Sequence, residues 1–170
     1  MTLAKRLSLS YVGSEDRILV VADDEHQNVF RLWLTQRLIT QAVLALVGWL
    51  KAPLADDENL SRDLTIQRWE QAAAIAQYSP SLAVAQSPAA SVEPREGLVT
   101  SIDLQHAAAG FALIFHLGSE AVLASHFTAV ELRQWLSILY GLYQAAGWPL
   151  ATWPTWFDKP IEGAAPSLIN

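Results

Sequence analysis

The sequence predicts an α+β fold built from two strand–β-hairpin–α-helix repeats, over about residues 7–51 and 98–147. Three observations lead to this expectation. Each unit contains short segments of alternating or β-branched apolar residues, which are typical of strands. Each unit then ends in a longer apolar segment that a threonine opens, Thr35 in the first and Thr128 in the second. A stretch rich in Ser, Pro and Ala separates the two units.

The first unit contains three predicted strands and a helix. The strands are expected at Leu7–Val12, Arg17–Ala22 and Asn28–Leu34, with the polar sequence DDEHQ as the turn before the third strand. The helix is expected from Thr35 to about Lys51. Every residue after Gln41 up to Leu50 is apolar or glycine. We therefore expect this helix to be buried on all sides, with its second face against the other unit or a dimer mate.

An extra helix is expected over about residues 60–78. Its apolar residues Trp69, Ala72, Ile75 and Ala76 are spaced as one buried stripe. A flexible connector without aromatic residues is expected to follow over residues 79–96.

The second unit repeats the order of the first. Its strands are expected at Leu98–Gln105, Phe111–Leu117 and Ala121–Phe127, and Gly118-Ser119 is typical of a tight turn. Thr128 and Glu131 have the spacing of a capping box at the start of the second helix. A shift of 93 residues aligns the units without a gap, placing Thr35 on Thr128 and Gly48 on Gly141. A true duplication is one explanation, and the other is that any hairpin followed by a helix aligns comparably well.

The expected organisation is one globular domain. It contains the first unit with the extra helix (1–78), the connector (79–96), the second unit (97–147) and a C-terminal strap (148–170). Each unit alone is too small to bury its own sheet, so the two units are expected to pack together.

The C-terminal strap is rich in tryptophan and proline. Trp148 and Trp153 each precede a proline, which disfavours helical geometry at the tryptophan, so we expect an extended segment. Such a segment either packs on its own chain or reaches a partner. Large aromatic side chains serve both roles, and the partner-binding hypothesis rests on Trp148, Trp153, Trp156 and Phe157.

Composition argues against several classes of protein. The chain has no cysteine, which excludes disulfides and thiolate chemistry, and its formal charge of −6 disfavours binding to nucleic acid. The N-terminal segment lacks the pattern of a secretory signal, and the most apolar segment is too short to span a membrane. A cytoplasmic protein without a membrane partner is expected.

Residues that could carry chemistry are few. His106, His116 and His126 lie ten residues apart, but a two-residue turn at Gly118-Ser119 predicts that His116 and His126 project from opposite sheet faces. The acidic runs at Asp23–Glu25 and Asp56–Glu58 are interpreted as solvated turns. We therefore predict no metal, no cofactor and no catalytic residue. Enzymatic activity stays an open possibility that the sequence does not favour.

The favoured function is a non-enzymatic protein-interaction or assembly module that acts as a homodimer. The apolar excess, the uniformly apolar helix and the tryptophan strap support it. The alternative is a small-ligand-binding domain or an enzyme with an apolar pocket between sheet and helices, lined by Trp33, Trp135 or aromatic residues of the C-terminal strap.

Overall fold

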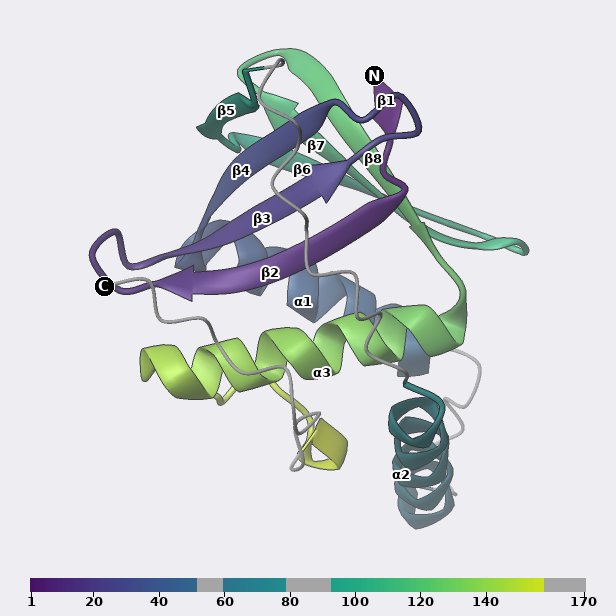
Figure 1. Cartoon of the computed structure of the whole chain (residues 1–170). Helices are drawn as coiled ribbons and strands as arrows, with labels where there is room; N and C mark the ends of the chain where they lie inside the picture. Colours follow the sequence, from purple (N-terminus) through teal and green to yellow (C-terminus); the bar gives the residue numbers. More distant parts are fainter. Residues whose placement is uncertain (52–59, 79–92, 158–170) are drawn as a thin grey trace.

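The computed structural model describes residues 1–51, 60–78 and 93–157, and these form two four-stranded sheets and three α-helices (Figure 1). The α+β class expected from the sequence is therefore confirmed. The elements, in chain order, are β1 Thr2–Leu3, β2 Arg6–Val12, β3 Arg17–Asp23, β4 Val29–Thr35, α1 Gln36–Lys51, α2 Leu60–Ala76, β5 Arg95–Leu98, β6 Ser101–Ala107, β7 Gly110–Leu117, β8 Glu120–Phe127, α3 Ala129–Ala146 and the 3-10 helix η3 Thr155–Phe157.

Each sheet combines a three-stranded antiparallel meander with one short parallel strand. The strand orders are β2-β3-β4-β5 and β1-β8-β7-β6, with β5 parallel to β4 and β1 parallel to β8. The predicted strand at Leu98–Gln105 is thus divided between two sheets. Arg95 and Glu96, which the sequence placed in the connector, belong to β5, and residues 79–92 of that connector lie outside the described residues.

The chain passes from one sheet to the other at two places and in the same way. The amide of Ala4 donates to Ala124 O at 2.8 Å in one sheet, and the next amide, of Lys5, donates to Asp23 O in the other. Val99 and Thr100 repeat this arrangement, donating to Trp33 O and His116 O at 2.9 Å. Consecutive amides bonded to different sheets fix the two sheets against each other at two corners.

The helices α1 and α3 lie beneath the sheets, and α2 lies farther away, beyond α3 (Figure 1). The helix α1 contacts β4 and β6, whereas α3 contacts β2, β7 and β8. Buried side chains from both sheets, both helices and the C-terminal segment form one hydrophobic core. A hydrogen bond of 2.7 Å between the hydroxyls of Thr40 and Tyr143 joins α1 to α3.

The predicted helix starts are confirmed. The amide of Leu38 donates to Thr35 Oγ1 at 3.3 Å, and Thr128 forms a complete capping box with Glu131. At the other end of α3, Gly147 adopts the left-handed conformation (φ 67°) that closes a helix at little steric cost.

Burial of α1 on all sides is not observed. Gln41, Leu44 and Gly48 are exposed, and Leu44 retains 51 % of its accessible surface. Because the buried residues of α1 follow helical spacing, its inner face alone contacts the sheets and α3, and a narrow strip stays outward. Within the described ranges, no helix is both long and apolar enough to cross a membrane.

Candidate interaction surfaces

Residues 148–157, the described part of the C-terminal strap, pack on their own chain. Trp148, Trp153, Trp156 and Phe157 are 6 %, 8 %, 5 % and 0 % exposed and belong to the hydrophobic core. The indole N–H of Trp148 donates to Asp16 Oδ1 at 2.8 Å, and its ring lies edge-on to Tyr11 and Tyr143. The four aromatic residues proposed from sequence to contact a partner therefore contribute little surface in a single chain.

The strap also turns rather than running extended over residues 150–157. The amide of Trp153 donates to Leu150 O, and the amide of Phe157 donates to Pro154 O at 3.1 Å. Proline has a fixed φ near −65°, which suits the start of a helical turn, so Pro154 leads directly into η3. Residues 158–170 of the predicted strap lie outside the described residues.

Aromatic rings hold this segment against α3. Trp153 lies edge-on to Tyr140, Tyr143 and Phe157, with ring centroids 5.2–5.3 Å apart. Lys51, at the end of α1, places its ammonium 5.1 Å above the ring of Trp156, a favourable cation–π geometry. The strap thus ties the ends of α1 and α3 together.

Trp33 and Trp135, proposed to line a common pocket, lie apart. Trp33 alternates with the core residues Leu32 and Leu34, so it projects from the opposite face of its sheet, where its indole donates to Glu96 Oε1 at 2.8 Å. Trp135 is buried on the inner face of α3 beside Phe127. An open groove of about 570 Å³ lies elsewhere, between residues 1–5 and the Glu25-His26 turn, and contains neither tryptophan.

The register corrects the predicted faces of two histidines. A shift between Phe115 and His116 leaves Val122 without an opposite residue, so His126 pairs with Ala112 instead of Phe111. Because residues 112 and 116 alternate onto one face, His116 and His126 share the outer face. They are nevertheless about 13 Å apart along the sheet. No group of three or more His, Asp or Glu side chains in the described ranges is arranged to hold a metal ion.

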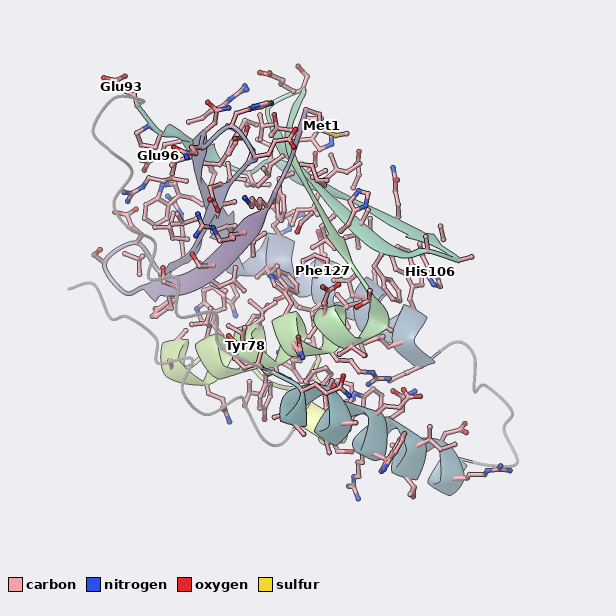
Figure 2. The ribbon with its side chains drawn as sticks, turned by 45° about the vertical axis from the view of Figure 1, so that its right-hand side comes forward. Met1, Tyr78, Glu93, Glu96, His106 and Phe127 are labelled. Carbon is pink, nitrogen blue, oxygen red and sulfur yellow. The ribbon has the colours of Figure 1, made fainter. Side chains whose placement is uncertain are left out.

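His116 and His106 each have a partner on the neighbouring strand, and His106 also stacks on Trp49 of α1, with ring centroids 5.5 Å apart. His116 Nε2 lies 2.9 Å from Asp103 Oδ2 on the outer face of the sheet. His106 is the cross-strand partner of Phe111 and stacks on its ring at 4.5 Å, near the outer end of the β6–β7 hairpin (Figure 2). Neither pair is joined by a further group that would complete a catalytic arrangement in the described part of the chain.

The helix α2 turns polar residues inward. Gln67 and Gln71 are 2 % and 1 % exposed, and they face the buried Arg133 and Ser137 of α3. The Arg133 guanidinium donates to Gln67 Oε1 at 2.6 Å and also binds the Glu70 carboxylate. Burial lowers the pKa of Arg133 from its ordinary value, and Glu70 opposes that shift.

The two buried glutamine amides connect α2 to its neighbours. Gln67 Nε2 donates to Leu50 O at the end of α1 at 3.0 Å, and Gln71 Nε2 donates to Ser137 Oγ. From the other side, Gln134 Nε2 donates to Ala74 O at 2.8 Å. The attachment of α2 is therefore a hydrogen-bonded network with a charge at its centre.

Three of the four apolar residues that sequence periodicity assigned to the core lie on the outward face of α2, and the fourth, Ile75, is half-buried. Trp69 is 72 % exposed, and Ala72 and Ala76 are exposed on the same helical stripe. The predicted buried stripe is therefore wrong, because a polar network with α3 determines which side faces inward. We call Trp69, Ala72 and Ala76 the outer stripe.

No protein-family model matches this chain, and comparisons with curated proteins and with solved structures found no match.

Proposed function

We propose that this chain is a non-enzymatic protein-interaction or assembly module that acts as a homodimer, and that two copies meet through the outer stripe of α2. The observation that carries the proposal is the 72 % exposure of Trp69. Tryptophan is costly to leave in water and is enriched among the residues that dominate binding energy at interfaces. The contact is assigned to Trp69 and not to the strap because the four strap aromatics are buried in their own chain.

Shape supports a second copy as the occupant. Trp69 is large, whereas Ala72, Ala73 and Ala76 are small and lie one or two helical turns farther along. In an antiparallel pair with its two-fold axis between Ala72 and Ala73, Trp69 of each copy lies opposite Ala76 of the other. An isologous interface of this kind needs one surface to be complementary to itself, and a large residue facing a small one provides that.

Charge is compatible with the same arrangement. The whole chain has a formal charge of −6, which opposes self-association in general. The charged residues of α2 are Arg62, Asp63, Arg68 and Glu70, two of each sign. Copies that meet through α2 therefore avoid much of the repulsion that acidic surfaces would cause.

The test is the molar mass of the chain in solution, measured by sedimentation over a range of concentrations. Trp69→Gln removes the tryptophan from both copies of the dimer. It is expected to raise the Kd by roughly 1000-fold, because each tryptophan is taken as an interface hot spot of about 2 kcal/mol. Leu44→Gln is the matched control, because Leu44 is the exposed apolar residue of α1. It is expected to leave the Kd unchanged.

Two results would overturn this assignment. If Leu44→Gln dissociates the dimer and Trp69→Gln does not, the contact lies on α1, whose second face was expected from the sequence to meet either the other unit or a dimer mate. A chain that stays monomeric at all concentrations would remove the homodimer, and Trp69 would then need a different partner.

The ligand-binding or enzymatic alternative has less support. Its pocket was expected to be lined by Trp33, Trp135 or aromatic residues of the strap. Trp33 and Trp135 lie on different sides of a sheet, and the described strap aromatics are packed in the core. Fluorescence quenching of tryptophan by a metabolite would favour this alternative over the interaction module.

We also infer that the two units arose by duplication. The equivalent crossovers at Ala4–Lys5 and Val99–Thr100, each followed by three strands and a threonine-capped helix, support this inference. The offset between equivalent residues changes along the two units. The crossovers align Arg6 with Ser101, and the helices align Thr35 with Thr128, because the loop of the first hairpin is shorter in the second unit. The test is a search for a related protein that consists of a single unit. Two chains of such a protein are expected to pair and to form both crossovers between them.

A further inference from the structure

We propose that α2 is a latch helix, which undocks from α3 and η3 as a unit while the two sheets, α1 and α3 stay folded. This inference concerns the inner face of α2 and is independent of the dimer contact proposed for its outer face. It rests on how few buried apolar side chains α2 contributes to its own attachment.

The hydrophobic core contains no side chain of α2 among the residues described. Among residues 62–76 of α2, Ala74 is the one apolar residue that is buried, whereas all six buried residues of α1 are apolar. Contacts from α2 go to α3 and η3, beyond the sheets (Figures 1 and 2). Removing α2 would therefore take no described side chain out of the core, although it would uncover η3, whose Trp156 and Phe157 belong to the core.

The attachment consists instead of the network around Arg133. When α2 undocks, Gln67, Gln71 and Arg133 exchange their bonds to each other for bonds to water, so the net cost of breaking each bond is small. Exposing the buried apolar side chains of α1 and α3 to water would cost free energy that no new hydrogen bond offsets. Segments with few buried apolar contacts open at lower free energy than the rest of a protein.

The network also explains how the latch closes in one position. Arg133 and the two glutamines use donors and acceptors on both helices and on Leu50 O, so a shifted helix would leave buried polar atoms unpaired. Undocking uncovers Arg133 and Ser137 together with the adjoining η3. A molecule that binds this uncovered surface would shift the equilibrium toward the open state.

The chain has no cysteine, so a single introduced thiol reports on one location. Ser137 is fully buried beneath α2, and Ser125 is 5 % exposed within β8. The variants Ser137→Cys and Ser125→Cys would be exposed to a thiol reagent under native conditions. We expect the thiol introduced at position 137 to react about tenfold faster or more, since it needs undocking alone and not global unfolding.

A second variant strengthens the assignment to the latch. Glu70 binds Arg133 from a half-exposed position, so Glu70→Gln is expected to speed labelling at position 137 by roughly two- to five-fold. Labelling at position 125 should not change in the same background. Equal labelling rates at the two positions, or equal acceleration by Glu70→Gln, would show that α2 opens only with the whole molecule.

Hydrogen exchange measured on the unmodified chain tests the same proposal without any cysteine variant, so the result does not depend on whether those variants fold. Amides of α2 should exchange faster than amides of α3 around Leu136 and Leu139, which lie in the core. Identical protection of α2 and α3 would overturn the proposal even if the labelling experiment succeeded.

Discussion

At the scale of single residues, Asp24 is a buried carboxylate within an acidic run that was expected to be solvated. The sequence interpretation placed Asp23–Glu25 in a solvated turn, yet Asp24 is 2 % exposed. Its carboxylate accepts bonds from the amides of His26 and Asn28 at 2.8 and 2.9 Å and from Asn28 Nδ2 at 2.7 Å. Burial would raise the pKa of Asp24, but the bonds from Asn28 and His26 outweigh it and lower the pKa below its ordinary value.

Replacing this carboxylate gives a prediction with a defined pH dependence. A lowered folded-state pKa means that the stabilisation is fully present above the ordinary aspartate pKa of about 3.9. It is lost as the pH falls through the lowered value. Asp24→Asn places an amide against Asn28 Nδ2, and we expect it to lower the free energy of unfolding by roughly 1–3 kcal/mol at pH 7.

Urea unfolding of both proteins from pH 7 down to pH 3 provides the measurement. The difference in stability between Asp24 and the Asn variant should narrow below about pH 4, as the carboxyl of the wild-type chain becomes protonated. A difference that stays constant across this range would show that the charge of Asp24 does not contribute.

Sequence reasoning succeeded at residues whose role is local. Thr35 and Thr128 cap helices because their hydroxyls reach amides three residues ahead, and this needs no knowledge of the rest of the fold. The faces of His116 and His126 depend on the register between strands. One unmatched residue, Val122, reverses the prediction, and no property of its side chain marks it in the sequence.

At the scale of elements, the strap and α2 show that the sequence identified apolar stripes better than their partners. Trp153 was expected on a strap that could contact another chain, and Trp69 was expected in the core. The structure buries Trp153 to 8 % exposure and leaves Trp69 at 72 %. Periodicity locates a stripe, but the contact that covers it comes from residues far away in the chain.

These two tryptophans provide a matched pair of substitutions. Trp153→Ala removes a ring that contacts three other aromatic residues, so we expect it to lower the free energy of unfolding by about 3–5 kcal/mol. Trp69→Ala is expected to change it by less than about 0.5 kcal/mol in the monomer, because an exposed side chain loses few contacts.

Chemical denaturation at a concentration low enough to keep the chain monomeric distinguishes the outcomes. If both substitutions prove neutral, the strap does not belong to the core, and its aromatics become available to a partner again. If both are severe, the outer stripe of α2 is covered within the chain, and Trp69 no longer supports a dimer.

The strand β5 was missed for a similar reason. Arg95–Leu98 lies at the end of a segment of Ser, Pro and Ala, and its own residues REGL have little strand character. It becomes a strand because β4 offers a free edge, with Arg31 and Glu96 forming an ion pair beside the register pair Trp33–Leu98. Such pairing between distant segments cannot be inferred from a local pattern.

At the scale of the whole molecule, the two halves are interlocked by exchanged strands. The first half supplies β1 to the sheet of the second, and β5, which leads into the second half, completes the sheet of the first. The sequence predicted that the halves pack together because each is too small to fold alone. It did not predict this exchange, which makes each sheet incomplete without the other half.

The interlock gives a prediction for a chain that is cut in two. Cleavage within residues 79–92, between the halves, should leave the two fragments associated and folded, because strand pairing and one shared core join them without the covalent link. Each fragment alone should lose its sheet structure, since it lacks one strand and half of the core. Size-exclusion chromatography and circular dichroism after cleavage, and again after separation and remixing, measure both effects. Recovery of structure on remixing is the expected result. Fragments that separate without denaturant, or that stay folded when apart, would show that the halves are independent domains.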